Sequence, residues 1–277
     1  MRGKICVITG ATDGIGLEVA ARLGARGARL VLVGRQRAKG EEVLAKLRQH
    51  APDIEAQMHY ADLSRRDEIA RLAPELLAAT PRIDVLLNNA GAFFAKRVVT
   101  EDGLEQTFAL NHMGYFRLTA LLRDRLIATA PARIVNVASQ AHRNATLDFG
   151  DLQIERGYNG WKAYRRSKLA NILFTRELAR RLAGTGVTAN CLHPGFVATS
   201  FGDNNRGVWG LGICLGKRFA AIPVGRGAET PVYVATSPAL DGVTGKYFDQ
   251  CREREPSAAA RNDADAARLW NESERLA

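Results

Sequence analysis

Residues 9–16 of the chain, Thr9-Gly10-Ala11-Thr12-Asp13-Gly14-Ile15-Gly16, decide the fold. They follow an apolar, β-branched run at residues 5–9 and precede a segment with helical periodicity. A glycine-rich turn between a strand and a helix can cradle phosphate groups, because backbone approaches the ligand closely and the helix N-terminus offers free N–H groups. In this interpretation Gly10 permits the turn, Gly14 admits a pyrophosphate and Gly16 lets the helix pack on the sheet. The expected cofactor contacts here also include Thr12, Asp13 and Ile15.

Short apolar runs and longer helical patterns alternate along the rest of the chain. Such a rhythm predicts an α/β fold, a doubly wound parallel sheet with helices on both faces. No repeat or linker divides the sequence, so we expect a single domain over residues 1–277. The predicted strands lie at 5–9, 30–33, 54–59, 85–87, 134–137, 187–191 and 245–248. The predicted helices lie at 16–26, 37–49, 65–79, 104–128, 161–183, 227–236 and 258–275.

The composition excludes several classes of protein. The chain has 277 residues and a formal charge of +10, but its basic residues are scattered among acidic ones, which argues against nucleic-acid binding. Its four cysteines show no ligand spacing, so neither a metal site nor a disulfide framework is expected. No uninterrupted apolar run is long enough for an integral membrane segment. A reducing cytoplasm is therefore the predicted location.

One segment, residues 196–225, departs from the alternating pattern. It is rich in glycine and large apolar residues but lacks the pattern of a sheet strand. We interpret it as a small apolar lid over a substrate pocket, with Phe196 and Trp209 against the substrate. A surface helix is the alternative interpretation.

The second predicted strand ends at Gly34-Arg35, where an NAD-binding protein usually carries an acidic residue for the ribose hydroxyls. An arginine there can instead bind a 2′-phosphate through two N–H groups, and Arg37 and Lys39 would add to the positive field. The sequence thus predicts NADP as cofactor, with NAD as the alternative. A solvated basic turn would explain the same residues without a ligand.

Several polar residues follow predicted strands or share one helix. Tyr164 and Lys168 are one helical turn apart, and Ser139 follows the fifth predicted strand. Asn88-Asn89-Ala90-Gly91 ends the fourth, and Asn111 lies in the predicted helix after it. Carboxyl ends of parallel strands meet at one edge of a sheet, so these groups are expected beside the cofactor.

With these motifs the chain resembles the short-chain dehydrogenase/reductase superfamily, and within it the retinol-dehydrogenase-like group. The matching motifs span nearly the whole chain, at residues 9–16, 62–64, 88–91, 111–114, 133–139, 164–171 and 193–195. The resemblance implies a seven-stranded Rossmann sheet and hydride transfer between a nicotinamide and an alcohol/carbonyl pair. It implies the catalytic residues Asn111, Ser139, Tyr164 and Lys168. It also implies cofactor contacts from Asp62, Leu63, Asn89, Ala90, Gly91, Tyr164, Lys168, Pro194, Gly195, Val197 and Thr199, and substrate contacts from Ser139, Gln140, Trp161 and Tyr164.

The chemistry requires the same residue types. A carbonyl that accepts hydride becomes an alkoxide and must be protonated as it forms. The expected donor is Tyr164, with its pKa lowered by the Lys168 ammonium. Ser139 would bind the substrate oxygen, and Asn111 would hold a water that links Lys168 to solvent. Asp13 departs from the family pattern and could weaken the preference for NADP.

The predicted function is an NADP(H)-dependent dehydrogenase or carbonyl reductase of a medium to large apolar small molecule. Two alternatives are a nucleotide-sugar epimerase or dehydratase, which shares the Tyr and Lys spacing, and an NADP-binding redox-sensing regulator without turnover. A homo-oligomer is left open. Structural roles are expected for His112, His142, His193 and Cys191, rather than catalytic ones.

Overall fold

A mostly parallel sheet forms the centre of the molecule. The computed structural model describes residues 1–197 and 222–277, and all statements below concern these residues. The strand order is β3-β2-β1-β4-β5-β6-β7-β8. The chain reverses its direction of travel across the sheet between β1 and β4, which is where α/β sheets bind ligands. The strands are β1 (Ile5–Thr9), β2 (Arg29–Gly34), β3 (Ala56–Tyr60), β4 (Val85–Asn88), β5 (Ala132–Val137), β6 (Val187–His193), β7 (Tyr247–Asp249) and β8 (Arg252–Arg254).

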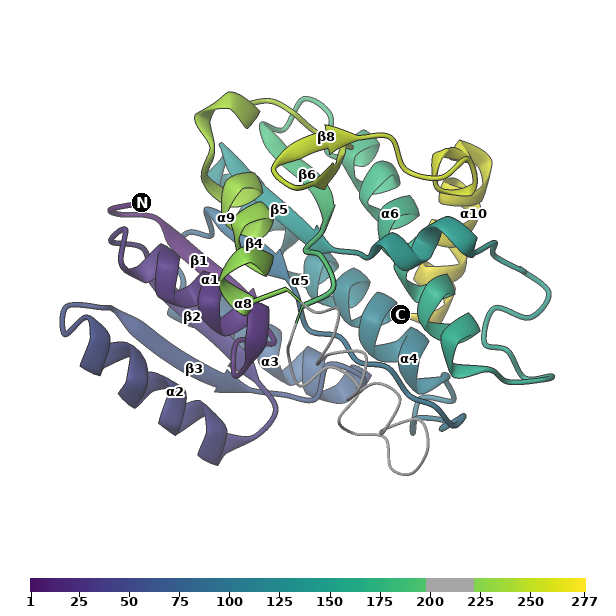
Figure 1. Cartoon of the computed structure of the whole chain (residues 1–277), viewed down its shortest axis with the longest axis horizontal. Helices are drawn as coiled ribbons and strands as arrows, with labels where there is room; N and C mark the ends of the chain where they lie inside the picture. Colours follow the sequence, from purple (N-terminus) through teal and green to yellow (C-terminus); the bar gives the residue numbers. More distant parts are fainter. Residues whose placement is uncertain (198–221) are drawn as a thin grey trace.

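Helices cover both faces of the sheet (Figure 1). Along β1, Cys6 and Ile8 join one apolar core, while Ile5 and Val7 join the other, as the two-residue period of a strand requires. One face carries α1 (Gly14–Gly24), α2 (Arg37–His50), α8 (Val224–Gly227) and α9 (Glu229–Thr236). The other carries α3 (Arg66–Ala79), α4 (Gln106–Phe108), α5 (Gly114–Thr129) and α6 (Gly160–Arg181). The doubly wound α/β prediction is confirmed.

In the part of the chain that the structure describes, the sheet has eight strands, one more than the seven expected. Strand β8 pairs antiparallel with β7 through a two-residue turn at Gln250 and Cys251. Both turn residues have positive φ, 51° and 58°, the conformation that a tight right-twisted hairpin needs. Glycine or asparagine usually signals such a turn, and neither residue is present here.

The long helix predicted over residues 104–128 is interrupted. Its first part is the single turn α4, and a π-helical segment, Ala109–Met113, leads into α5. A Cβ at Gly114 would lie 2.7 Å from the Leu63 carbonyl oxygen, so this glycine permits close packing where the helix changes type. Apolar periodicity does not report such a change.

The last predicted helix, 258–275, is also divided. A 3-10 turn, Ala259–Arg261, precedes α10 (Asp263–Leu276), whose first N–H groups are capped by Asn262. Helix α10 packs across α6, where Trp270 stacks on Phe174 with ring centroids 5.9 Å apart. In residues 1–197 and 222–277, no helix is both long enough and apolar enough to span a bilayer.

Candidate active site

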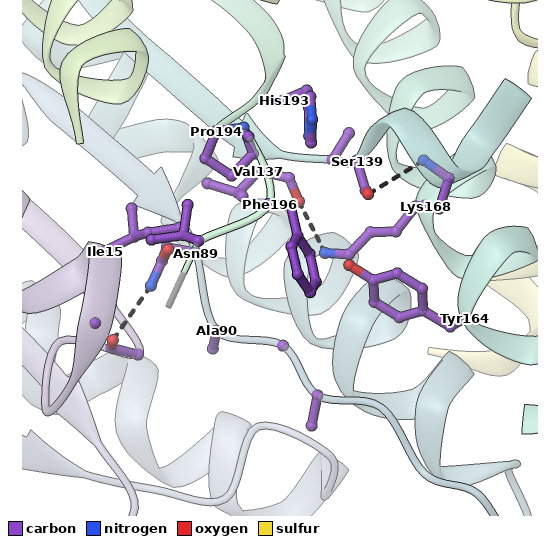
Figure 2. Close-up of a pocket in the computed structure, with 18 of the residues that line it drawn as sticks. Ile15, Asn89, Ala90, Val137, Ser139, Tyr164, Lys168, His193, Pro194 and Phe196 are labelled. Atoms are coloured by element: carbon purple, nitrogen blue, oxygen red, sulfur yellow. Dashed lines mark hydrogen bonds between the residues drawn. The ribbon is translucent and has the colours of Figure 1, made fainter. Parts of the chain in front are cut away.

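A cavity of about 570 Å³ opens at the carboxyl ends of the central strands (Figure 2). In the figure, Ile15, Asn89 and Ala90 lie on one side of it, and Tyr164 and Lys168 on the other. The lining residues are Gly10, Thr12, Asp13, Gly14, Ile15, Arg35, Asn89, Ala90, Gly91, Ala92, Val137, Ala138, Ser139, Gln140, Ala141, Trp161, Tyr164, Lys168, His193, Pro194, Gly195, Phe196 and Val197. Most of the predicted site residues thus meet around one cavity.

The glycine-rich turn forms one end of this cavity. Gly10 and Gly14 have positive φ of 65° and 51°, and the N-terminus of α1 faces the space between them. Gly16 lies behind the turn, where a Cβ would come within 2.2 Å of the Gly10 carbonyl oxygen. Asn89 Nδ2 donates to the Thr9 and Gly10 carbonyl oxygens at 2.9 and 3.2 Å, which fixes the turn. The α1 N-terminus and the lack of a side chain at Gly10 and Gly14 fit the pyrophosphate of a dinucleotide.

Asp13 brings a negative charge to this end of the cavity. Its carboxylate accepts a hydrogen bond from the Gly14 N–H at 2.6 Å and caps α1. The Asp13 charge would oppose the binding of a phosphate at this helix N-terminus.

The predicted basic group at the second strand is only partly at the cavity. Arg35 lines it, with a side chain 60% exposed and Nη1 3.8 Å from Asp62 Oδ2. Arg37 turns away and stacks over the Tyr60 ring at 4.7 Å, and the exposed Lys39 does not line the cavity. Arg35 is therefore the basic group of this strand end that faces the space.

Ser139 and Tyr164 meet at the opposite end. The Ser139 side chain acts on the Tyr164 hydroxyl and lowers its pKa, and Ser139 Oγ accepts from the Ala141 N–H at 3.2 Å. Tyr164 is buried, and burial raises its pKa to about 12, with the Ser139 hydrogen bond acting in the opposite direction. The phenol is protonated at neutral pH and is poised to donate.

Lys168 lies beside this pair, also buried. Its Nζ donates to the Val137 carbonyl oxygen at 2.9 Å and is 5.8 Å from the centre of the Tyr164 ring. Burial lowers the Lys168 pKa to about 7. The expected lowering of the Tyr164 pKa by this ammonium is not found in the chain by itself, because desolvation disfavours both charged forms and outweighs their attraction.

Asn111 does not line the cavity but stands behind it, in the π-helical segment. Its Oδ1 accepts from the Ala92 N–H at 2.9 Å, and its Nδ2 donates to the Ala92 carbonyl oxygen and to Ser167 Oγ, both at 3.0 Å. A Cβ at Gly91 would lie 3.1 Å from Asn111 Oδ1 and 3.4 Å from Lys168 Nζ. Asn111 thus supports the wall next to Lys168.

An aromatic cluster that the sequence interpretation missed in part flanks Tyr164. The Phe93 ring lies 4.9 Å from that of Trp161 and 6.3 Å from that of Tyr164. Phe93 is fully buried, and Trp161 lines the cavity. Gly160 permits the contact, since a Cβ there would lie 2.5 Å from the Phe94 carbonyl oxygen. The only signal for Phe93 in the sequence is its place soon after the Asn-Asn-Ala-Gly motif.

Some predicted residues do not line the cavity, and some residues that line it were not predicted. Asp62 and Leu63 lie outside the cavity wall, although Asp62 contacts Arg35. Thr199, Trp209 and most of the proposed lid lie outside the described residues. The wall also contains residues that were not predicted as ligand contacts, namely Ala92, Val137, Ala138, Ala141 and His193. Three of them, Val137, Ala138 and His193, lie in the motifs at 133–139 and 193–195, which is a signal that was available.

The predicted structural histidines are all buried. His112 Nε2 is 2.8 Å from Ser273 Oγ in α10, and His142 Nδ1 is 2.6 Å from the Ser139 carbonyl oxygen. His193 lines the cavity, and burial lowers its pKa to about 4, so it is neutral. Within the described part of the chain, no cluster of three or more His, Cys, Asp or Glu side chains could hold a metal ion.

Known proteins resemble this chain over almost its full length. Retinol dehydrogenase 14 of Mus musculus is 42% identical over 290 residues, which cover 99% of this chain and 86% of that protein. Human retinol dehydrogenase 12 is 41% identical and covers 98% of this chain and 85% of its own length.

Solved structures of other proteins also resemble this chain. An uncharacterized protein from Mycobacterium paratuberculosis has a TM-score of 0.79 and 31% identity, covering 99% of this chain and 93% of that one. An actinorhodin polyketide ketoreductase solved with NADPH has a TM-score of 0.70 and 26% identity, covering 90% and 97%. The family model described as short chain dehydrogenase matches residues 4–207. From the strand order, the glycine turn, the Ser139, Tyr164 and Lys168 cluster and these matches, the chain belongs to the short-chain dehydrogenase/reductase family, retinol-dehydrogenase-like group, and is an oxidoreductase acting on CH–OH groups.

Proposed function

We propose that the chain is an NADP(H)-dependent oxidoreductase that interconverts an apolar alcohol and its carbonyl compound. The observation that carries the proposal is that Ser139, Tyr164 and Lys168 line one end of a cavity whose other end is the glycine turn. A nicotinamide cofactor, when bound, exchanges hydride with the substrate carbon. All proton handling then falls to the residues of this chain.

In the direction of reduction, Ser139 and Tyr164 bind the substrate carbonyl oxygen. Hydride adds to the carbonyl carbon, and the Tyr164 hydroxyl transfers its proton to the oxygen as negative charge develops there. Because burial raises the Tyr164 pKa, the phenol keeps the proton that it donates. The proposed role of Lys168 is to stabilise the phenolate left behind, with Asn111 and Gly91 supporting its surroundings. In oxidation, Tyr164 accepts the proton instead.

The proposed preference for NADP over NAD rests on Arg35, which lines the cavity. A guanidinium that binds a 2′-phosphate forms charge-assisted hydrogen bonds of roughly 1.5 to 3 kcal/mol. Since this side chain is 60% exposed, solvent weakens the pair, and we expect the lower end of that range, about a tenfold preference for NADPH.

Dissociation constants for NADPH and NADH test this assignment. Arg35→Ala should weaken NADPH binding about tenfold and leave NADH nearly unchanged. Arg35→Asp should reverse the order, because a carboxylate repels the phosphate but accepts hydrogen bonds from ribose hydroxyls. The control is Lys39→Ala, a nearby cation outside the cavity wall, which should leave the ratio within about twofold. Equal losses for both cofactors in Arg35→Ala would contradict the assignment.

The proposal of an apolar substrate rests on the residues that form the cavity wall beside Tyr164. Trp161 and the half-exposed Phe196 face the cavity there, and Phe93 supports Trp161 from behind. Aromatic walls of this kind favour apolar or planar substrates. Turnover of a panel of aldehydes and ketones with NADPH tests the proposal, and cofactor binding without turnover of any carbonyl would favour a regulator instead.

The cytoplasmic location also remains a proposal. Cys6 and Cys191 are buried free thiols, and thiols persist in a reducing compartment. Cell fractionation tests the location, and gel filtration with light scattering tests whether the chain forms a homo-oligomer.

A further inference from the structure

His142 lies behind the catalytic cluster and has no function in the chemistry described above. It belongs to the 3-10 helix Gln140–Asn144, is fully buried and does not line the cavity. The Ser257 N–H lies 3.2 Å from His142 Nε2 and must donate to it. Nε2 is therefore an acceptor, and the ring proton lies on Nδ1, 2.6 Å from the Ser139 carbonyl oxygen. The two contacts together assign one tautomer of a neutral imidazole.

The Ser139 carbonyl consequently accepts two hydrogen bonds from one residue. One comes from the His142 ring, and the other from the His142 backbone N–H at 3.2 Å. The Ser139 side chain caps the same 3-10 helix through the Ala141 N–H. These bonds fix the peptide plane after Ser139 and the direction of its side chain. A shift of that plane would move the Ser139 hydroxyl relative to Tyr164.

The outer side of the His142 ring is held by a distant part of the chain. Ser257 Oγ accepts from the Ala260 N–H at 3.3 Å, which joins Ser257 to the turn before α10. Arg143 donates to the Glu255 carbonyl oxygen at 3.0 Å, a second bond to the same segment. The Tyr247 ring of β7 packs edge-on against His142 with centroids 5.1 Å apart. The ring is thus locked between Ser139 and residues 255–260.

We propose that His142 is a positioning residue: its Nδ1–H holds the Ser139 carbonyl, while the Ser257 N–H fixes the tautomer of the ring. The inference rests on the proposed catalytic role of Ser139. It differs from a plain packing role because the contact that matters is the inner hydrogen bond to Ser139, not the volume of the ring.

Two polar variants separate the inner contact from the outer one. In His142→Asn, the side-chain amide can replace Nδ1 as donor to Ser139 but cannot reach Ser257. In His142→Gln, the longer side chain can accept from Ser257 but leaves the Ser139 carbonyl without the ring bond. We expect kcat of the Asn variant within about threefold of wild type, and kcat of the Gln variant about ten- to a hundredfold lower. NADPH affinity should stay within about twofold in both, because the glycine turn is untouched.

His142→Phe keeps a ring against Tyr247 and removes both hydrogen bonds, so it should lose kcat like the Gln variant. The control is Leu269→Ala, a buried residue of α10 outside the cavity wall, which should lower Tm without changing kcat of the folded enzyme by more than about twofold. If His142→Phe does not fold, the Asn and Gln pair decides. Equal kcat for that pair, a higher kcat for Gln, or a loss of kcat in Leu269→Ala as large as that in the Gln variant would overturn the proposal.

A Ser139→Ala arm distinguishes failure of this inference from failure of the proposed function. If Ser139→Ala loses kcat by about 10²-fold or more, the catalytic role of Ser139 stands, and wild-type turnover by His142→Gln then overturns the positioning role only. If Ser139→Ala turns over normally, the catalytic role falls and the positioning role with it. In the Ser139→Ala background, His142→Gln should add less than about twofold, since the group to be positioned is gone.

Discussion

Replacing His112 by phenylalanine should make the folded chain less sensitive to acid. His112 is fully buried among the rings of Phe108, Phe116 and Phe174, and this burial lowers its pKa from 6.5 to about 3. The unfolded chain takes up a proton there below pH 6.5, whereas the folded chain does not. The stability that depends on neutral His112 is therefore complete above pH 6.5 and is lost as the pH falls. From pH 6.5 to 5.0 one such group costs ~2 kcal/mol, at roughly 1.4 kcal/mol per pH unit.

Urea unfolding at pH 7.5 and pH 5.0 measures the effect. The difference in unfolding free energy between the two pH values should be ~2 kcal/mol smaller in His112→Phe than in wild type. Some acid sensitivity should persist, because burial also lowers the pKa of His193, to about 4. The control is Ser273→Ala, which removes the hydrogen-bond partner of His112 but leaves the ring buried. It should lower stability similarly at both pH values. A His112→Phe variant with the full wild-type pH dependence would refute the reasoning.

Three other predictions concern the site. Tyr164→Phe should lower kcat about 10²- to 10⁴-fold with an unchanged cofactor dissociation constant, because only the proton donor is lost; near-normal turnover would contradict its role. Asp13→Asn should tighten NADPH about two- to fivefold, since a charge leaves the α1 N-terminus; weaker binding in a titration would make Asp13 a necessary cap instead. Trp161→Ala should raise KM for bulky apolar carbonyls more than for small ones, and equal changes across a substrate series would assign the ring a structural role.

Most of the fold could be predicted from residue periodicity. Strands buried on both faces, such as β1 and β2, have continuous apolar runs that are bounded by turn residues. The hairpin of β7 and β8 could not be predicted, because Gln250 and Cys251 adopt positive φ without the usual residue types. The π-helical segment at Asn111 could not be predicted either, because it keeps the apolar pattern of an α-helix while its hydrogen bonding changes.

The site was predictable where residue type and strand end coincide, as for Ser139 and the glycine turn. The pKa values of Tyr164 and Lys168 were not, because a helical spacing places two side chains on one face but does not report how deeply they are buried. The links from His112 to Ser273 and from His142 to Ser257 join residues more than a hundred positions apart. No local pattern in the sequence predicts contacts of that kind.

The packing of α10 across α5 and α6 has a consequence for the order in which the protein is made. Phe116 and Phe174 are buried against Trp270, and Arg117 donates to the Leu276 carbonyl oxygen, 159 residues further along the chain. During synthesis this aromatic face stays uncovered until α10 has left the ribosome, long after the sheet strands have emerged. Exposed apolar surface of this kind binds chaperones or aggregates. The nascent chain is therefore vulnerable until α10 is translated.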